Sequence, residues 1–488
     1  MSVEAHANWI GGRHVSAPSH YSVVNPATEE AVGYAPESRD GDVSAAVGAA
    51  REAYGSWARV EPRRRAAVLE RIADLIDAHA KDLVPLVQAE TGATMRVAST
   101  MQVPTAADRF RRYARGALEP TVVPLGPHPV GASALAPAGL IGAAAVRRPA
   151  GVVACITSYN FPIVNLAGKV APALAMGNTV VAKPAPQDPL GCLELGPLFQ
   201  EAGLPDGVYN VITGSGAAAG EALVAHPDVD MISFTGSTAV GKRIAESAGR
   251  RMARTLMELG GKGAAVVLPD ADDRALKSAV MAVGSTWSFH SGQICTAPTR
   301  VLVHRSQYEQ VVAGLKHYAS ALTIGDPVDN STVVGPLISA AQRDRVEAYV
   351  AGAVEQGARL VAGGERPAIK PGFYVAPTLL ADVRPDMTVA QEEIFGPVVV
   401  ALAYDTEDEA VAIANGTPYG LYDYVFSADS ARAWSLASRL RSGNVGINTA
   451  QRHPETPFGG FKESGVGRDG GSFGLHAYSE LQSVVWPS

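Results

Sequence analysis

The feature that most constrains the fold is a regular alternation of short apolar runs and helix-like segments between residues 151 and 248. The apolar runs are uniformly hydrophobic, as fully buried parallel strands are, and the segments between them have helical spacing. The expected strands are 151–156, 179–184, 208–213 and 231–236, and the expected helices are 163–176, 190–202, 217–225 and 239–248. This alternation predicts a parallel sheet covered by helices on both faces. Ligands bind at the carboxyl ends of such strands, so we expect functional loops after Ile156, Ala182 and Phe234.

The rest of the chain divides around this region. A second alternating region begins near Lys262 and runs to about Asn448, and the earlier segment 62–83 has one apolar face at helical spacing. In the second region we expect strands at 263–268 and 300–304 and a helix at 271–287. The stretch 120–145 is rich in Gly, Pro and Ala and is compatible with either a protruding hairpin or a linker. At roughly 150 residues per domain, a chain of this length is expected to form about three units.

Charge and cysteine content exclude several classes of protein. The 488 residues carry a formal net charge of −7 with no concentrated basic run, which argues against a nucleic-acid partner. Three cysteines form no paired disulfide framework and match no zinc spacing, so we expect no metal site. The longest apolar stretch, 135–146, is too short to span a bilayer, and residues 1–10 lack the features of a signal peptide. These observations predict a cytoplasmic protein with reduced thiols and no membrane partner.

The segment SFHSGQICTAPTR (288–300) raises the question of what Cys295 does. A lone cysteine is most often a small buried hydrophobe. The residues at 291–293 and 296 are Ser, Gly, Gln and Thr, which is a poor composition for a core segment. A reactive thiol requires partial exposure and nearby hydrogen-bond donors or positive potential. The composition leaves both interpretations open, a filler of the core and a nucleophile.

The segment FTGSTAVGKRI (234–244) has the glycine and lysine spacing of a phosphate-binding P-loop. Arg243, however, stands where a P-loop needs Ser or Thr to hold magnesium, so we reject a nucleotide-hydrolysing P-loop. The segment still indicates a strand, a turn at Gly236 and Ser237, and then a helix. Free N–H groups at the start of that helix favour an anion such as a pyrophosphate, and a plain strand–helix turn is the alternative.

Two glutamates stand next to glycines at predicted loops. In MELGGKG (257–263), Glu258 ends a strand-like run before two glycines, which allow backbones to approach closely. In EEIFGPV (392–398), Glu393 precedes Phe395 and a Gly-Pro pair. On composition alone, each glutamate is either a functional carboxylate at a loop or a solvated residue on a surface turn.

Together these segments resemble the aldehyde dehydrogenase superfamily, in the family's order and over nearly the whole chain. TSYNFP resembles the family's asparagine loop, KPAP its adenosine loop, and FTGST its pyrophosphate turn. ELGGK resembles the segment with the general base, and GQICTAPTR the segment with the nucleophile. EEIFGPV resembles the nicotinamide-ribose segment, and PFGGFKESGVGR (457–468) the C-terminal signature. Seven collinear motifs leave little room for chance.

The resemblance implies a role for each residue that matches a family motif. The implied catalytic residues are Cys295 as nucleophile, Asn160 as oxyanion donor, Glu258 as base for hydrolysis, and Lys169 near that base. The implied cofactor contacts are Thr157, Lys183, Pro186, Gly236, Ser237, Glu393 and Phe395. The implied substrate-pocket residues are Val164, Gly168, Phe289, Arg452 and His453. The expected cofactor is NAD or NADP, the expected substrate is a small-molecule aldehyde, and no metal is required.

The resemblance also implies an α/β architecture with three parts. These are a Rossmann-like parallel-sheet cofactor domain (1–121 and 144–262), an α/β catalytic domain (263–455), and a β oligomerisation arm (122–143 and 472–488). The arm implies a homodimer or homotetramer. The implied reaction is oxidation of an aldehyde to its acid through a cysteine thiohemiacetal and thioester.

The chain departs from the family pattern at several positions. Tyr159 stands where the family usually has Trp, and Asp469 replaces the more frequent Glu. Gly168 stands where a bulky aromatic often lines the substrate tunnel, which indicates a roomier tunnel suited to aromatic or branched aldehydes. Pro186 replaces the acid of many NAD-preferring members, which removes a charge that would repel the extra phosphate of NADP. No arginine stands nearby in sequence to clamp that phosphate, so we expect use of both cofactors with NAD somewhat favoured.

Three alternatives remain at this stage. A CoA-acylating relative would resolve the thioester with CoA, but that chemistry needs no water-activating base such as Glu258. A catalytically silent relative acting as a binding protein has no need to keep Cys295, Asn160 and Glu258 together. For the substrate, Arg452 and His453 favour an aldehyde that carries a carboxylate, unless they are solvated charges at the rim.

Overall fold

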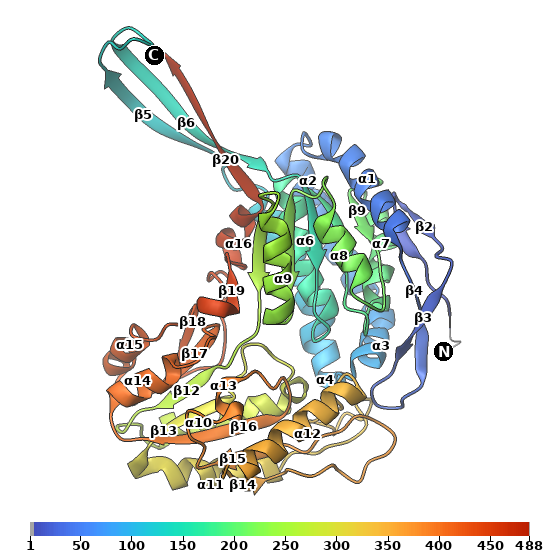
Figure 1. Cartoon of the computed structure of the whole chain (residues 1–488). Helices are drawn as coiled ribbons and strands as arrows, with labels where there is room; N and C mark the ends of the chain where they lie inside the picture. Colours follow the sequence, from blue (N-terminus) through green and yellow to red (C-terminus); the bar gives the residue numbers. More distant parts are fainter. Residues whose placement is uncertain (1–3, 488) are drawn as a thin grey trace.

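The computed structural model of the protein describes residues 4–487. Residues 1–3 of the predicted cofactor domain and Ser488 of the predicted arm therefore lie outside the described residues. Figure 1 shows two α/β bodies, one above the other, with a long β arm projecting from the upper body. The two largely parallel sheets, each covered by helices, and the β arm match the predicted α/β fold class. The domain boundaries given above stay predictions.

The upper body is built on an eight-stranded sheet with the order β19-β11-β10-β7-β8-β9-β1-β2. The central strands from β11 to β9 are parallel, and β19, β1 and β2 extend the sheet antiparallel. Its strands are β1 (Asn8–Ile10), β2 (Arg13–Val15), β7 (Val152–Ile156), β8 (Thr179–Lys183), β9 (Tyr209–Val211), β10 (Met231–Thr235), β11 (Arg254–Glu258) and β19 (Gly465–Val466). Every residue of β7 and β8 is buried, which confirms the expectation of parallel strands covered on both faces.

Helices cover both faces of this sheet. One face packs in a common core with α2 (Pro62–Ala78), α3 (Ala80–Thr91), α5 (Val103–Gly116), α6 (Pro162–Met176) and α7 (Leu190–Glu201). The opposite face packs with α1 (Asp40–Trp57), α8 (Ala218–Ala225) and α9 (Thr238–Gly249). The predicted stop of the 163–176 helix is confirmed, because Gly177 follows α6 in the left-handed conformation with φ of 93°.

The lower body is built on a seven-stranded sheet with the order β14-β15-β16-β13-β12-β17-β18, parallel except for β14. Its strands are β12 (Ala264–Val267), β13 (Arg300–His304), β14 (Arg359–Ala362), β15 (Thr378–Ala381), β16 (Val398–Tyr404), β17 (Tyr422–Phe426) and β18 (Asn444–Ile447). Its helices are α10 (Asp273–Ser288) and α11 (Tyr308–Ser320) in one core, and α12 (Ala340–Glu355), α13 (Thr388–Gln391), α14 (Glu407–Asn415) and α15 (Ser430–Ala437) in the other.

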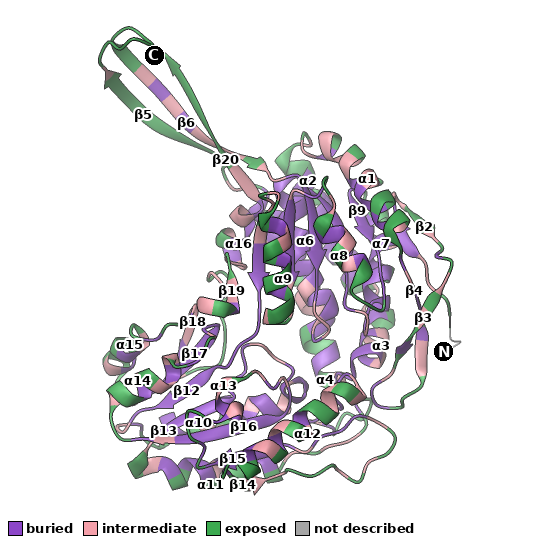
Figure 2. Ribbon diagram, in the orientation of Figure 1, coloured by how far each residue is buried: buried purple, intermediate pink, exposed green. Residues whose placement is uncertain are grey.

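The arm is a three-stranded antiparallel sheet of β5 (Val122–Val130), β6 (Gly139–Pro149) and β20 (Ser479–Pro487). Of the two possibilities for 120–145, the structure therefore shows the hairpin. Figure 2 shows the arm exposed along most of its length. Its exposed large apolar side chains are Val122, Val123, Leu125, Leu140, Leu481, Val484, Val485 and Trp486.

Two details differ from the sequence expectations. The segment 62–83 is not one helix, because His79 leaves the helical conformation (φ −97°, ψ 10°) between α2 and α3. Its apolar face continues across this break through Ile76 and Leu83, both buried, so the spacing alone gives no sign of it. The segment before β20 forms a separate helix, α16 (Gly471–Ala477), which packs against α5 and α6. The shorter elements are β3 (His20–Val24) paired with β4 (Ala31–Pro36), and α4 (Met95–Val97).

Candidate active site

One cavity of about 1640 Å³ lies at the carboxyl ends of β7, β8, β10 and β11 and is also lined by loops of the lower body. The expected loops are confirmed, because Thr157, Lys183 and Thr235 all line this cavity. All the predicted site residues line it except Lys169, which is buried behind the wall. The structure therefore brings together residues that are up to about 300 positions apart in sequence.

Cys295 lies in a tight turn after α10 and is half-buried. The preceding His290, Ser291 and Gly292 all have left-handed φ values of 51°, 53° and 76°. A Cβ on Gly292 would overlap the carbonyl oxygen of Gly396, so only glycine fits there. The turn is thus pressed against the EEIFGPV segment, and Cys295 is only half-buried and lines the cavity, which excludes a simple core filler.

The ELGGK segment packs against the same turn from the other side. A Cβ on Gly261 would overlap the carbonyl oxygen of Cys295, and a Cβ on Gly260 would overlap the Glu393 carboxylate. These contacts confirm that the glycines after Glu258 serve close approach of backbones. Three motif segments that are far apart in sequence therefore meet at backbone distance around the thiol.

Hydrogen bonds fix the turn further. The Gln293 side chain is fully buried and accepts a hydrogen bond from the backbone of Ile338 at 3.0 Å. The Tyr424 hydroxyl donates to the carbonyl of Thr296 at 2.7 Å. The turn of Cys295 is therefore held by other segments of the lower body and not by its own loop alone.

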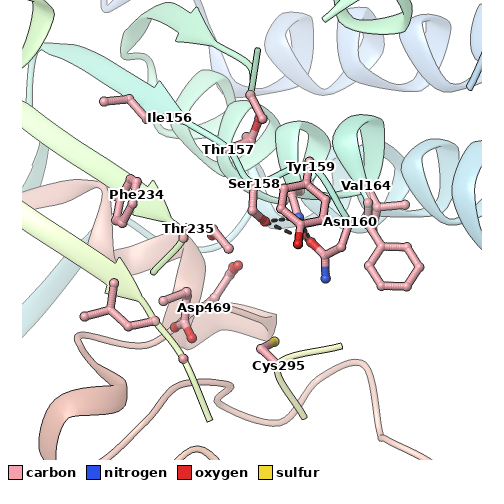
Figure 3. A pocket seen from close by; sticks show the side chains of 18 of the residues that line it. Ile156, Thr157, Ser158, Tyr159, Asn160, Val164, Phe234, Thr235, Cys295 and Asp469 are labelled. Atoms are coloured by element: carbon pink, nitrogen blue, oxygen red, sulfur yellow. Dashed lines mark hydrogen bonds between the residues drawn. The ribbon is translucent and has the colours of Figure 1, made fainter. Parts of the chain in front are cut away.

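Asn160 lies in the loop between β7 and α6 and faces the thiol. Its amide oxygen accepts hydrogen bonds from Ser158 Oγ at 2.9 Å and Asn165 Nδ2 at 3.2 Å. Its amide nitrogen donates to the backbone carbonyl of Gln293 at 2.8 Å. Figure 3 shows this nitrogen pointing to the side of the pocket from which the Cys295 sulfur projects. The amide orientation is therefore fixed with its N–H groups toward the nucleophile turn.

Glu258 is the last residue of β11, and its side chain is almost fully buried. Within residues 4–487, neither carboxylate oxygen has a hydrogen-bond partner. Burial raises the pKa of Glu258 well above its usual value, the Asp469 carboxylate raises it further, and the Lys169 cation opposes this shift. A buried, unpartnered carboxyl group with a raised pKa is suited to accept a proton.

Lys169 lies on α6 behind the cavity wall. Its ammonium group donates to Ser233 Oγ at 3.2 Å, and Ser233 Oγ lies 2.8 Å from the Tyr478 hydroxyl. Burial is the largest cause that lowers the pKa of Lys169, while Asp469 and Glu258 raise it. The position is consistent with an electrostatic influence on Glu258 and not with contact to a ligand in the cavity.

The thiol itself is protonated at rest. Burial raises the pKa of Cys295 to about 12, and the Arg452 guanidinium is the largest influence in the opposite direction. Nucleophilic attack therefore requires that a neighbouring group remove the proton of this thiol.

The opposite end of the cavity has the features of a dinucleotide site. Ser237 caps α9, where its hydroxyl accepts a hydrogen bond from Val240 N at 3.4 Å, and the start of this helix faces the cavity. Such a start suits a pyrophosphate. Thr157 Oγ1 is buried with no hydrogen-bond partner in the described part of the chain. Burial lowers the pKa of Lys183 to about 8, and its ammonium group donates only to Pro184 O at 3.3 Å.

The side predicted to contact the nicotinamide is also fixed by hydrogen bonds and ring contacts. Burial raises the pKa of Glu393 to about 7, and one of its oxygens accepts a hydrogen bond from Gly261 N at 2.9 Å. Phe395 has a left-handed φ of 59°, and its ring meets that of Tyr159 edge to face at 5.7 Å. These contacts hold both side chains on the cavity wall, and the cavity therefore fits NAD or NADP.

Sequence reasoning missed two arginines of this cavity. Arg243 lines the adenosine end, where it forms an ion pair with Glu221. Arg109 of α5 lines the substrate end and donates to the carbonyl of Val164 at 3.0 Å. A Cβ on Gly168 would overlap Arg109 Nη1, so the space left by this glycine is filled. The expectation of a roomier tunnel at Gly168 was wrong, and no local sequence signal connects positions 109 and 168.

The remaining wall of the substrate end is aromatic. Phe289 stacks on Phe161 with ring centroids 5.6 Å apart. The Arg452 guanidinium lies 4.5 Å from the ring centroid of Phe458, and the His453 ring accepts a hydrogen bond from Glu455 N at 3.2 Å. An aldehyde in this space would contact hydrocarbon walls with cations at their edge.

Two features are absent from residues 4–487. No group of three or more His, Cys, Asp or Glu side chains in that range is arranged to hold a metal ion. No helix in that range is long and apolar enough to cross a membrane.

Comparisons with known proteins agree with this site. A family model described as the aldehyde dehydrogenase family matches residues 14–484. A geranial dehydrogenase of Castellaniella defragrans is 39% identical, with 99% of both chains covered. A betaine aldehyde dehydrogenase of Rhizobium meliloti is also 39% identical, with 98% of this chain and 96% of the relative covered.

Solved structures give the same result. An indole-3-acetaldehyde dehydrogenase of P. syringae in complex with NAD+ and IAA has a TM-score of 0.93 and 34% identity, covering 100% of this chain and 97% of that one. An aldehyde dehydrogenase of Pseudomonas syringae complexed with NAD+ and octanal has a TM-score of 0.91 and 40% identity, covering 98% and 96%. On a match that runs from residue 14 to residue 484 and on relatives aligned over nearly their whole length, the chain belongs to the aldehyde dehydrogenase family.

Proposed function

We propose that the chain oxidises an aldehyde to the carboxylic acid through a thiohemiacetal and then a thioester on Cys295. The observation that carries this proposal is the shared cavity, in which Cys295, Asn160 and Glu258 stand beside the residues suited to a dinucleotide. A binding protein has no need for a strained turn that holds a thiol against the ELGGK and EEIFGPV segments.

The first step is attack of the Cys295 sulfur on the aldehyde carbon. Because the pKa of the thiol is raised to about 12, its proton has to be transferred as the C–S bond forms. Glu258 is the buried carboxylate in the same cavity, and its raised pKa makes it an effective acceptor of that proton.

The charge that develops on the aldehyde oxygen needs hydrogen-bond donors. One N–H of Asn160 is held by the Gln293 carbonyl at 2.8 Å, which leaves the other N–H of the amide for this oxygen. The two hydrogen bonds to the Asn160 oxygen keep the amide from turning over. A donor fixed in advance stabilises the transition state without reorganisation at the moment of reaction.

Collapse of the thiohemiacetal then expels a hydride from the former aldehyde carbon and leaves a thioester on Cys295. When bound, NAD or NADP supplies the acceptor for that hydride. Once Glu258 has released the thiol proton to solvent, it takes a proton from the water that attacks the thioester and returns it to the Cys295 sulfur, so that the carboxylic acid and the free thiol are released. Lys169, behind the wall, is a positioning residue whose cation lowers the pKa of Glu258.

A direct test follows NADH at 340 nm in wild-type protein and in a Cys295→Ala variant, with hexanal and NAD. We expect steady production by the wild type and none by the variant, since the thioester cannot form without the thiol. Addition of CoA separates the acylating alternative, which would require CoA for turnover. Production of NADH by the alanine variant would refute the assignment of the nucleophile.

The assembly and location are further parts of the proposal. The exposed apolar side chains of the arm, such as Leu125, Leu481 and Trp486, are expected to be covered by a second subunit in a dimer or tetramer. Light scattering at micromolar concentration is expected to give a dimer or tetramer, and a monomer would contradict this. Cys155, Cys192 and Cys295 are free thiols, which supports a reducing, cytoplasmic location.

A further inference from the structure

The substrate end of the cavity contains a cation in a place that the backbone leaves open for it. Gly168 lies on buried helix α6, and any side chain there would collide with the guanidinium of Arg109 from α5. The atom that a Cβ would displace is Arg109 Nη1, and Cζ of the same guanidinium lies 3.0 Å from the Cβ position. The glycine and the arginine are therefore complementary, since the small residue gives the large one its position on the wall.

Arg109 differs from the neighbouring arginines of the same helix. Arg111 forms ion pairs with Asp74 and Asp77, and Arg112 forms ion pairs with Glu119 and Glu455. Arg109 has no carboxylate within 4.0 Å in the chain from residue 4 to residue 487, and its one hydrogen bond goes to a backbone carbonyl. Most N–H donors of this half-buried guanidinium therefore have no partner among the described residues.

A second cation faces the same space. Arg452 lines the cavity, lies over the ring of Phe458, and lowers the pKa of Cys295, so its charge acts on the reacting thiol. Among the ion pairs within residues 4–487, none involves Arg452. This end of the cavity thus has two cations whose charge is not compensated by direct pairing.

The acidic groups of this region do not cancel that charge. Asp469 is the nearest, with Oδ2 3.6 Å from the Cβ position of Gly168, and its other oxygen accepts a hydrogen bond from Gly470 N at 2.7 Å. Asp108 is exposed and lies beside Arg111 at 3.7 Å. Burial raises the pKa of Glu258, which disfavours its ionised form. The guanidinium groups of Arg109 and Arg452 outnumber the side chain of Asp469, and they leave a positive potential where the substrate tail would lie.

We propose that Arg109, with Arg452, binds an anionic group at the far end of the substrate, so that the preferred substrates are aldehydes that also carry a carboxylate. This inference rests on the proposed aldehyde oxidation. A guanidinium binds a carboxylate through two parallel N–H donors, which suits the free donors of Arg109. The aromatic wall of Phe161, Phe289 and Phe458 lies along the same cavity, so the linker between the two groups is a hydrocarbon chain.

The test compares each ω-oxo carboxylic acid of a chain-length series with its own methyl ester, which has the same aldehyde and linker but no charge. The measured quantity is the ratio of kcat/KM for acid and ester at saturating NAD. Wild-type protein is expected to prefer the acid at one or two chain lengths by at least about tenfold, as a charged hydrogen bond predicts. The variant Arg109→Gln is expected to lower this ratio by about 10- to 100-fold.

Two further variants sharpen the test. Gly168→Ala keeps both arginines but displaces the guanidinium of Arg109, so the acid-to-ester ratio is expected to fall without a change of charge. Arg115→Gln removes the same charge from an exposed position of the same helix, outside the cavity, and is expected to leave the ratio unchanged. Loss of selectivity in Arg109→Gln but not in Arg115→Gln would support a specific contact over a general field effect.

The outcomes separate this inference from the proposed function. Oxidation of the esters with an acid-to-ester ratio of one or below, or an unchanged ratio in Arg109→Gln, overturns the inference and leaves aldehyde oxidation intact. Faster oxidation of amino aldehydes than of oxo acids also overturns it, in favour of Asp469 as the recognition group. Absence of NADH with every aldehyde refutes the proposed function instead. In that case, adipate is titrated into the Cys295→Ala protein. Binding that is lost in Cys295→Ala/Arg109→Gln would support the inference, and absence of binding would overturn it.

Discussion

The centre of the cavity and its two ends are built in different ways. Around Cys295, backbone meets backbone, because Gly261 and Gly292 allow the carbonyls of distant segments to approach within contact distance. The ends are lined instead by long side chains such as Arg109, Arg243 and Arg452, which reach in from separate elements. The centre, where backbones are in contact, therefore tolerates few substitutions. The lining of an end, in contrast, changes when a single side chain is replaced.

The comparison predicts two kinds of variant. A substitution at the centre is expected to slow every aldehyde and both cofactors alike, because the same thiol, amide and carboxylate act in each turnover. A substitution at an end is expected to change the relative use of substrates or cofactors. The predictions below test this division, from the largest expected effect to the smallest.

The largest effect is expected for Glu258→Gln. The glutamine cannot accept the proton of the attacking water, so hydrolysis of the thioester slows by about 10²- to 10⁴-fold. If thioester formation tolerates the loss better than hydrolysis does, rapid mixing will show a burst of about one NADH per active site before slow turnover. Glu52→Gln, at an exposed position of α1, is the matched control and is expected to behave as wild type. A wild-type steady-state rate in Glu258→Gln would contradict the assignment of the base.

A smaller effect is expected for Asn160→Ala. Removal of one oxyanion donor typically raises the barrier by ~2.7–4 kcal/mol, which lowers kcat by about 10²- to 10³-fold. Asn165→Ala keeps this donor but removes one of the two contacts that hold the Asn160 amide, so it is expected to cost less. Equal effects of Asn160→Ala on aldehydes with and without a carboxylate would agree with its place at the centre. Unequal effects would contradict the distinction between the centre and the ends.

The pH dependence of kcat/KM is the next test. Burial raises the pKa of Cys295 to about 12, so the thiol keeps its proton until Glu258 takes it. Glu258 must therefore be deprotonated to react, and burial raises its pKa well above the usual value. A raised pKa means that the protonated, inactive form persists to higher pH, so kcat/KM is expected to rise with pH by up to about tenfold per unit. A profile that is flat or falls between about pH 6 and pH 9 would contradict these protonation states.

The same division explains how much the sequence alone could predict. The motifs of the centre could be recognised because their resemblance to a family lies in short contiguous segments, and close backbone contact was expected from local sequence at the glycines after Glu258, such as Gly261. The contact between Arg109 and Gly168 joins two helices across 59 positions, and nothing local marks either residue as its partner. The break at His79 was missed because the apolar face of the helix continues through it.

The adenosine end should give the smallest change, and a selective one. Pro186 has no charge, so it neither accepts hydrogen bonds from the adenosine ribose of NAD nor repels the extra phosphate of NADP. Lys183 remains as a buried cation whose ammonium group has only a carbonyl partner and can approach either group. Arg243 is already paired with Glu221, so it would attract the extra phosphate of NADP less strongly than an unpaired guanidinium would. We therefore expect use of both cofactors with NAD somewhat favoured.

Pro186→Glu is expected to lower kcat/KM for NADP by about tenfold or more, because like charges at a desolvated contact repel by several kcal/mol at most. The same variant is expected to change NAD use little, since the new carboxylate accepts hydrogen bonds from the ribose hydroxyls. NAD thus serves as the internal control, measured at one saturating aldehyde concentration. An equal loss with both cofactors would mean that position 186 acts on the centre and not on the end alone. A wild-type preference for NAD above about 1000-fold, or ~4 kcal/mol, would mean that a group other than residue 186 excludes the phosphate of NADP. The ion pair of Arg243 and Glu221 would then be the first contact to remove by substitution.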